Sequence, residues 1–289
     1  MAPTASQHPN PQPSLIRKGT FLGRLALKFF FEPLHRLREM QLPDHDIEFA
    51  LNGYRLKAFP PRRNKISRYI HEHGVWEPEV TRCAQQRIRA GMRVWDIGAD
   101  VGYFSLLFAG LAGPDGRVRA FEPIPKARVR LEENLRLNAC ANVEVESRAL
   151  GCKPGKFILE KPLEVSRINL EKTLPGPDDI EVQVVRGDDV FAESGWPSLD
   201  VIKLDVEGAE LEILRGLTGV LQRHHPALIL EIHGPYLPMF GASGEEVVRW
   251  LQGQGYKLEP LDSANPRWNE ENTTVWASHT DAQRHDQSS

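Results

Sequence analysis

Cysteine is scarce in this chain of 289 residues. The three cysteines, Cys83, Cys140 and Cys152, are an odd number and show no C-x-x-C spacing. This arrangement argues against a disulfide framework and against a cysteine-rich zinc site. We therefore expect free thiols and a reducing compartment, which predicts a cytoplasmic location.

Histidines at metal-ligand spacing are also missing. His71 and His73 lie two residues apart, and His224 and His225 are adjacent. Two histidines that bind one metal from the same face of a helix typically lie four residues apart. Solvated or capping roles suit all four side chains better, and we expect no metal ion.

The chain lacks a strong charge of either sign, because 36 Lys and Arg residues stand against 39 Asp and Glu residues. The basic run at residues 62–68 has no aromatic residues interleaved in the way typical of nucleic-acid binding, and it is more typical of a solvated face. We therefore predict no nucleic-acid partner. With 40% hydrophobic residues, the chain can bury the core of one or two domains.

No apolar run is long enough to span a membrane, because Arg24 and Lys28 interrupt the longest candidate. That candidate belongs to a basic amphipathic segment, which we place at residues 15–44. Two interpretations of it remain open. It is either an interfacial helix, with residues 15–40 on the inner face of an anionic membrane, or a leading helix docked on the following domain.

What the chain does contain is a glycine loop between a short apolar run and an amphipathic stretch. The run Val94 to Ile97 precedes Gly98-Ala99-Asp100-Val101-Gly102, and Tyr103 follows. Glycine is needed where the backbone turns sharply and approaches a ligand, and the next helix offers unpaired N–H groups. The pattern predicts a nucleotide-like cofactor.

The loop lacks the third glycine of a dinucleotide fingerprint, which places a pyrophosphate at the helix N-terminus. Glu122 ends the next strand-like run, about twenty residues after Gly102, where an acid can accept hydrogen bonds from ribose hydroxyls. Ribose recognition without a pyrophosphate cradle favours S-adenosylmethionine. The candidate cofactor-binding residues are Asp96, Gly98, Ala99, Asp100, Gly102, Tyr103, Glu122 and Asp205.

A third stretch, Ile202 to Glu210, repeats the order of apolar strand, acid and helix start. Together with the glycine loop, Phe121-Glu122-Pro123 and Asn138, it resembles the FkbM family of S-adenosylmethionine-dependent methyltransferases. The resemblance covers roughly residues 70–260. One departure is Asp100, where the family usually has asparagine. The resemblance implies a class I methyltransferase fold and transfer of a methyl group to a hydroxyl.

Periodicity and turn residues predict an α/β fold, a doubly wound, Rossmann-like and mostly parallel sheet. We expect strands near 92–97, 116–121, 142–147, 199–205, 226–233, 255–260 and 272–277, and helices near 103–112, 124–138, 207–216 and 244–253. The methyltransferase domain is placed at 45–278. It includes a hairpin at 46–60, around Asn52-Gly53, and a substrate-loop insertion at 155–190. Residues 1–14 and 279–289 are expected to be disordered.

Asp205 and His233 end two of the expected strands and are the candidate catalytic residues, because ligands bind at the carboxyl ends of such strands. If the two strands are adjacent and in register, Lys203 pairs with Glu231 and Asp205 lies near His233. His233 then has two open interpretations. It is either the base that takes the acceptor's proton, with Asp205 behind it, or a structural residue that caps the strand.

The combined interpretation is a methyltransferase that uses S-adenosylmethionine and modifies a small-molecule or glycan acceptor. The resemblance implies a hydroxyl on a sugar, glycolipid or polyketide-like metabolite. Two other classes stay open. An NAD-dependent oxidoreductase is disfavoured by the missing third glycine. A non-catalytic cofactor-binding or membrane-tethered scaffold would bind the cofactor without turnover.

Overall fold

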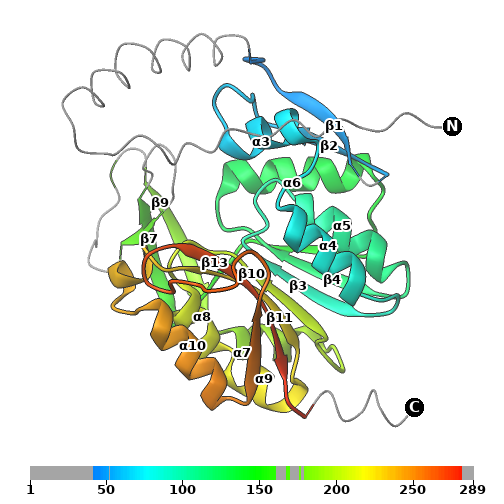
Figure 1. The fold of residues 1–289 in the computed structure, drawn as a ribbon. Helices are drawn as coiled ribbons and strands as arrows, with labels where there is room; N and C mark the ends of the chain where they lie inside the picture. The colour runs from blue at the N-terminus through cyan, green and yellow to red at the C-terminus, as the bar shows by residue number, and fades with distance from the viewer. Residues whose placement is uncertain (1–41, 52, 161–166, 170–175, 177–178, 282–289) are drawn as a thin grey trace, which may run out of the picture.

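A seven-stranded sheet forms the centre of the protein in a computed structural model (Figure 1), which describes residues 42–51, 53–160, 167–169, 176 and 179–281. The strand order is β12-β13-β11-β10-β3-β4-β5, and β13 is antiparallel to both of its neighbours. The strands are β3 (Arg93–Ile97), β4 (Arg117–Phe121), β5 (Val143–Glu146), β10 (Val201–Leu204), β11 (Ala227–His233), β12 (Tyr256–Pro260) and β13 (Asn272–His279).

The order reverses between β3 and β10, which are parallel neighbours. The chain runs outward from β3 through β4 to β5 and then returns to β10 on the other side of β3. In such sheets the crevice at the carboxyl ends of the two central strands is where ligands bind. The doubly wound fold predicted from the sequence is confirmed, and Asp205 lies directly at this crevice.

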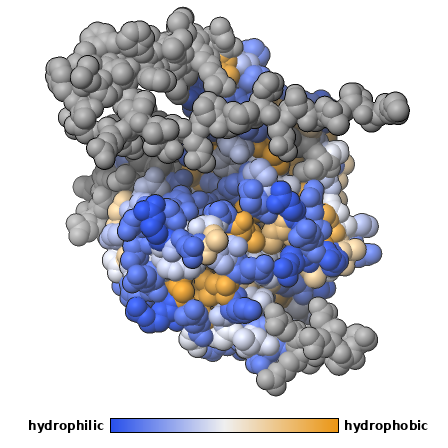
Figure 2. All heavy atoms as spheres, viewed as in Figure 1, coloured by the Kyte–Doolittle hydropathy of each residue, from blue (hydrophilic) through white to orange (hydrophobic). Residues whose placement is uncertain are grey.

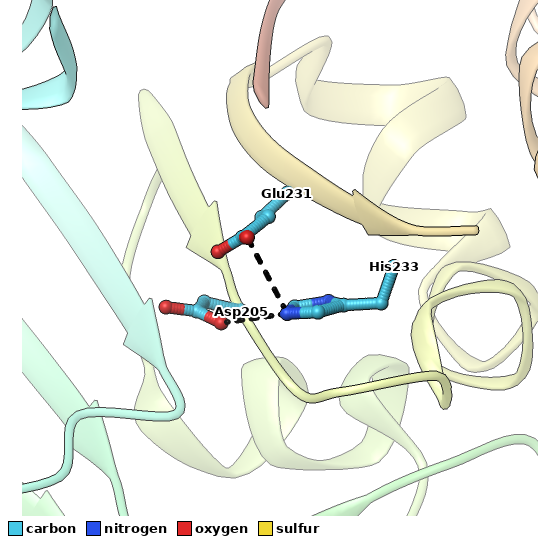
Figure 3. Close-up of side chains that lie close together, drawn as sticks. All are labelled: Asp205, Glu231 and His233. Carbon is cyan, nitrogen blue, oxygen red and sulfur yellow. Dashed lines mark ion pairs between the residues drawn. The ribbon is translucent and has the colours of Figure 1, made fainter. Parts of the chain in front are cut away.

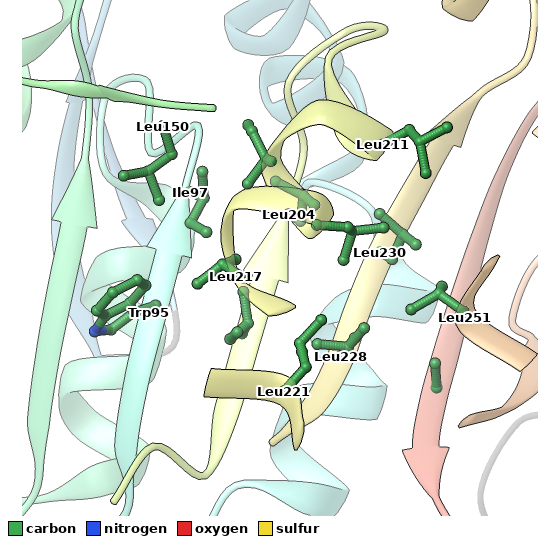
Figure 4. Packing of buried hydrophobic residues seen from close by; sticks show 14 of the residues in the cluster. Trp95, Ile97, Leu150, Leu204, Leu211, Leu217, Leu221, Leu228, Leu230 and Leu251 are labelled. Atoms are coloured by element: carbon green, nitrogen blue, oxygen red, sulfur yellow. The ribbon is translucent and has the colours of Figure 1, made fainter. Parts of the chain in front are cut away.

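Helices cover both faces of the sheet (Figure 1), and each face has its own apolar core. Helices α3 to α6 pack on one face of the sheet, and helices α7 to α10 pack on the other. In Figure 4, Leu211, Leu217 and Leu221 pack near Leu204 and Leu228. The helices are α3 (Lys65–His73), α4 (Pro78–Arg87), α5 (Tyr103–Ala112), α6 (Pro125–Leu137), α7 (Gly187–Ser194), α8 (Glu210–Gly216), α9 (Thr218–His224), η2 (Leu237–Phe240) and α10 (Gly244–Gly253).

The central strands are apolar on both faces because both faces are covered, as parallel sheets require. All four residues of β10 are buried, including Lys203. Helix α6 begins with Pro125 at a position where the missing N–H costs nothing. Helix α8 begins at Glu210, three residues later than expected, because Glu207 and Gly208 have left-handed backbone with φ of 53° and 114°.

A second, four-stranded sheet has the order β6-β9-β7-β8. It is built mostly from the segment that the sequence predicted as an insertion at 155–190, although that segment ends inside α7. Its strands are β6 (Ala149–Leu150), β7 (Gly155–Glu160), β8 (Arg167–Asn169) and β9 (Ile180–Val185). The irregular part of the predicted substrate loop lies largely outside the described residues, so its link to a substrate stays a prediction.

The predicted N-terminal hairpin is present as β1 (Ile47–Leu51) and β2 (Tyr54–Ala58), with Leu51 paired to Tyr54. The segments expected at 1–14 and 15–40 lie outside the described residues. At the other end, β13 runs to His279, one residue into the expected tail. Among the described residues, no helix combines the length and apolar character that crossing a membrane requires. The face drawn in Figure 2 is mainly hydrophilic, with apolar residues in small separate patches.

Two asparagines, Asn134 in α6 and Asn138 at the C-terminus of that helix, form hydrogen bonds with the edge of β2 that has no neighbouring strand. The side chain of Asn134 accepts from Lys57 N at 2.8 Å and donates to Lys57 O at 3.0 Å and Val101 O at 2.8 Å. Asn138 makes the same pair of bonds with Arg55 N and O. These side chains replace the neighbouring strand that β2 lacks on this edge. They also tie the hairpin to the glycine loop.

Asn134→Ala is therefore expected to lower the free energy of unfolding by about 2–3 kcal/mol, because it removes three hydrogen bonds from a fully buried group. Asn138→Ala is the matched control. It loses equivalent bonds at a half-exposed position where water can replace them, so a loss of about 1 kcal/mol is expected. Urea unfolding measures both, and equal losses would show that the burial of Asn134 is unimportant.

Candidate active site

The glycine loop joins β3 to α5 and is fixed by hydrogen bonds to the end of β4. Gly98 N and Ala99 N both donate to Phe121 O, at 3.1 and 3.0 Å. Gly98, Asp100 and Gly102 all have left-handed backbone, with φ of 87°, 45° and 92°. A Cβ on Gly98 would lie 1.9 Å from the carbonyl oxygen of Asp205. The loop therefore lies directly against the residue that follows β10.

Asp96 is fully buried at the end of β3. Its Oδ2 accepts a hydrogen bond from Ser105 Oγ at 2.5 Å, whereas its Oδ1 is buried without a hydrogen-bond partner. Burial raises the pKa of Asp96, although Lys203 and Ser105 act in the opposite direction. A bound molecule that offers a hydrogen-bond donor would satisfy the unpaired oxygen, so Asp96 fits a role in holding a cofactor.

Glu122 links the glycine loop to the start of α6. Its Oε2 accepts from Asp100 N at 2.9 Å and its Oε1 accepts from Ile124 N at 2.8 Å. Each carboxylate oxygen keeps a second lone pair, which is the acceptor that ribose hydroxyls need. Burial, with a contribution from Asp100, raises the pKa of Glu122 to about 8. Burial likewise raises the pKa of Asp100 to about 6.

A second group of predicted residues, Asp205 and His233, lies at the ends of β10 and β11 (Figure 3). His233 Nε2 lies 3.6 Å from Asp205 Oδ1 and 3.5 Å from Glu231 Oε1. On its other side, His233 Nδ1 forms a 2.7 Å hydrogen bond with Glu210 Oε1 at the start of α8. The prediction that Asp205 lies near His233 is confirmed.

Lys203 differs from its prediction, because its ammonium pairs with Asp205 Oδ2 at 2.9 Å instead of with Glu231. The parallel register sets Lys203 beside Ile229, so Glu231 lies two residues further along β11. The ammonium also lies 4.6 Å from the centre of the Phe104 ring. Lys203 thus orients the candidate catalytic Asp205 directly.

The electrostatics of this group reflect burial and crowded carboxyls. Burial opposes ionisation of Asp205, but Lys203 and His233 outweigh it and hold its pKa below the usual value. Burial raises the pKa of Glu231 to about 7 and that of Glu77 to about 8. For His233, burial lowers the pKa, but bonding to Glu210 and the nearby Glu231 and Asp205 raise it to about 9.

The predicted site residues thus form two adjoining groups. Asp96, the glycine loop and Glu122 form one, Asp205 and His233 form the other, and the contact of Gly98 with Asp205 joins them. Tyr103 is buried, and its hydroxyl lies 3.2 Å from Thr81 Oγ1 of α4.

Two residues of the second group were not assigned to a site from the sequence. Glu210 was identified only as the last residue of a stretch that resembles the FkbM family, and Glu77 was given no role. Glu77 precedes α4 with φ of 42°, and its carboxyl interacts with those of Asp205 and Glu231. Nothing in the local sequence around Glu77 indicates that contact, because α4 meets the strand ends only in the folded chain.

Comparison with known proteins shows the family of this chain. The sequence pattern of the methyltransferase FkbM domain matches residues 96–258. The chain is 31% identical over 200 residues to the 31-O-demethyl-FK506 methyltransferase FkbM of Streptomyces tacrolimicus, covering 59% of this chain and 75% of that relative. It is 29% identical over 158 residues to the hexuronic acid methyltransferase AglP of Haloferax volcanii, covering 54% of this chain and 62% of that relative.

A solved structure, that of methyltransferase FkbM from Methylobacillus flagellatus KT, aligns with a TM-score of 0.49 at 20% identity. That alignment covers 73% of this chain and 50% of the other. The domain match, by contrast, spans more than half of this chain and contains both groups of site residues apart from Glu77. The chain therefore belongs to the FkbM family of methyltransferases, whose cofactor is S-adenosylmethionine.

Proposed function

We propose that the protein transfers the methyl group of S-adenosylmethionine to a hydroxyl on a sugar, glycolipid or polyketide-like metabolite. The observation that carries the proposal is the contact between the glycine loop and Asp205, because it brings a cofactor site and a group of proton acceptors together. The names of two relatives, one acting on 31-O-demethyl-FK506 and one on hexuronic acid, support an oxygen acceptor.

In this proposal the first group holds the cofactor. Glu122 accepts the ribose hydroxyls, Asp96 offers its unpaired oxygen, and Gly98, Ala99, Asp100, Gly102 and Tyr103 shape the loop. S-adenosylmethionine supplies an electrophilic methyl group, so the protein needs mainly to align the acceptor oxygen and exclude water. Those tasks suit the carboxyl ends of β3 and β10, where Asp96 is fully buried.

Asp205 and His233 are proposed to bind the acceptor hydroxyl, and the ionised Asp205 to take up its proton, because the raised pKa of His233 leaves its imidazole protonated at neutral pH. Asp205 Oδ1 and His233 Nε2 are 3.6 Å apart, so one hydroxyl oxygen can contact both atoms. Glu210 and Lys203 act as positioning residues, because each holds one of these two side chains from behind. A positioned base is useful here because an alcohol releases its proton reluctantly.

The test is a transfer assay with isotopically labelled S-adenosylmethionine and acceptors from three classes, namely uronic acids, glycolipids and macrolides. A labelled methyl group in a methyl ether of the acceptor, located by mass spectrometry, is the expected result. Asp205→Asn keeps the shape of the side chain and is expected to lower kcat by about 100-fold or more. Labelling on nitrogen alone, or full activity in Asp205→Asn, would contradict the proposed chemistry.

The role of Glu122 predicts how cofactor binding depends on pH. Its carboxyl is protonated below a pKa of about 8 in the ligand-free protein, whereas two ribose hydroxyls are accepted best by the ionised form. Affinity for S-adenosylhomocysteine should therefore rise with pH, by at most about tenfold per unit, and level off above that pKa.

Calorimetric titrations of wild type and Glu122→Gln between pH 6.5 and 9 isolate this contribution. The variant should lose the part of the pH dependence that Glu122 causes and bind about 1–3 kcal/mol more weakly at high pH. Glu132→Gln, on the exposed side of α6, is the control and should follow wild type. If Glu122→Gln also follows wild type, Glu122 does not bind the ribose.

A further inference from the structure

We infer that Asp205, Glu231 and His233 form a binding site for one divalent cation of the zinc type, held at the ends of β10 and β11. The site itself stands on geometry and charge alone. Its part in catalysis, which is to bind the acceptor hydroxyl in an open coordination position, rests on the proposed function.

The distances match three ligands that share an ion. His233 Nε2 lies 3.5 Å from Glu231 Oε1 and 3.6 Å from Asp205 Oδ1, and the three atoms all lie within 4.8 Å of one another. A hydrogen bond between charged groups would be about 2.7–2.9 Å. Ligands about 2.1 Å from a tetrahedral zinc are about 3.4 Å apart. Nε2 thus points at both carboxylates (Figure 3) from a distance that suits an ion between them.

The orientation of His233 is fixed from behind, as it is in zinc sites. Its side chain is only 4% exposed, and Nδ1 is taken up by the fully buried Glu210 at 2.7 Å. This leaves Nε2, which makes no hydrogen bond of its own within the described chain, directed at the two carboxylates. A carboxylate on the far nitrogen is the usual support for a metal-binding histidine.

The other two ligands have similar support. Lys203 Nζ contacts Asp205 Oδ2 at 2.9 Å, which leaves Oδ1 directed at His233. Asn272 Nδ2 donates at 3.2 Å to Glu231 Oε1, the oxygen that faces His233, which keeps a second lone pair for the ion. Three protein ligands leave a fourth position open, which is the arrangement of catalytic zinc sites. An ion there would lower the pKa of a bound hydroxyl, and the released proton would pass to water, because Asp205 and His233 as ligands could not accept it.

The charges around the site also call for a cation. Three carboxyl groups, those of Asp205, Glu210 and Glu231, lie within 3.6 Å of the basic nitrogens of Lys203 and His233. Unpaired buried charge is costly, and a divalent ion would offset it. The expectation of no metal came from the cysteines and from histidine spacing, and a site with one histidine and two carboxylates at the ends of two strands shows neither signal.

The test is calorimetric titration of chelator-treated protein with Zn²⁺, without cofactor or acceptor, so its result does not depend on methyl transfer. We expect one ion per chain, and a Co²⁺ absorption spectrum of tetrahedral type. His233→Ala and Glu231→Gln should each weaken binding by about 100-fold, and Glu210→Gln, which acts through His233, by about 10-fold or more. Circular dichroism of the metal-free variants checks that they are folded.

Glu77→Gln is the matched control, because it removes a carboxyl of the same group that is not a proposed ligand. It should change the affinity for Zn²⁺ by no more than about threefold, because it removes only the long-range attraction between one carboxylate and the ion. Absence of Zn²⁺ binding by wild type would overturn the site. So would equal losses in Glu77→Gln and Glu231→Gln, because the ion would then be attracted by charge without being coordinated. If the ion binds and no acceptor is methylated, the proposed function fails and the site stands.

Discussion

Replacing Gly98 with alanine is expected to lower the free energy of unfolding by about 3–5 kcal/mol and to abolish tight cofactor binding. The added Cβ would lie 1.9 Å from the carbonyl oxygen of Asp205 and 3.0 Å from its carbonyl carbon. Contacts this short force two backbone segments apart. The φ of 87° adds a second penalty, because a side chain disfavours that conformation.

Neither segment can move away cheaply. On one side, Gly98 N and Ala99 N are bonded to Phe121 O. On the other, Asp205 N donates to Ile97 O at 3.0 Å. A shift large enough to admit the methyl group would displace Asp205 or break the loop from β4. Methyl transfer should then fall by about 100-fold or more, because small displacements of reacting groups are that costly.

Gly91→Ala is the matched control for Gly98→Ala. Gly91 has φ of 86°, almost identical to that of Gly98, but a Cβ there would meet no atom within 4 Å. Only the backbone penalty remains, so a loss of about 1 kcal/mol with normal cofactor binding is expected. Urea unfolding and titration with S-adenosylhomocysteine measure both variants. Similar losses in the two would show that the close approach of the loop to Asp205 is not what requires glycine.

The glycine loop could be predicted because its signal is local. An apolar strand, two glycines and an amphipathic helix follow one another within a dozen residues, and Glu122 lies at the end of the next strand. The local sequence does not show why residue 98 must be glycine. The atom that excludes a side chain there belongs to Asp205, more than a hundred residues away. The role of the glycine as a contact between two motifs appears only in the fold.

The charged group at the strand ends shows the same limit. Alternation along two adjacent strands correctly predicted that Asp205 lies near His233, but alternation does not set the offset between strands. The offset puts Ile229 beside Lys203 and thereby gives Lys203 a different partner from the predicted one. Glu210 was assigned to a helix terminus by its position, and its bond to His233 depends on how α8 packs on β11.

Lys203→Met is expected to lower the free energy of unfolding by about 3–5 kcal/mol, because it removes one partner of a buried ion pair. Methionine keeps the length of the side chain and the contact with Phe104, so packing changes little. The substitution removes the ammonium group that compensates the negative charge of Asp205 and of the nearby Asp96 and Glu77. Lys203 is only 3% exposed, so water cannot replace the lost partner.

Lys156→Met provides the matched control for this prediction. Lys156 pairs with Glu181 at 2.8 Å, nearly the same distance as in the buried pair, but the two side chains are 73% and 52% exposed. Water and salt screen such a pair, so little change in stability is expected. If both methionine variants lose the same stability, burial is not what makes the Lys203 pair important.

The double variant Lys203→Met/Asp205→Asn separates two effects of the single change: the loss of the attraction between Lys203 and Asp205, and the cost of a buried carboxylate left without a partner. Removing both charges should be less destabilising than the sum of the two single changes, with a coupling energy of about 1–3 kcal/mol. Urea unfolding of the four proteins at neutral pH gives that energy directly. Additive losses would mean that Lys203 stabilises the strand ends through Asp96 and Glu77 and leaves Asp205 to be oriented by His233 and Glu231. The cycle therefore decides which carboxylate at the end of the sheet depends on this lysine.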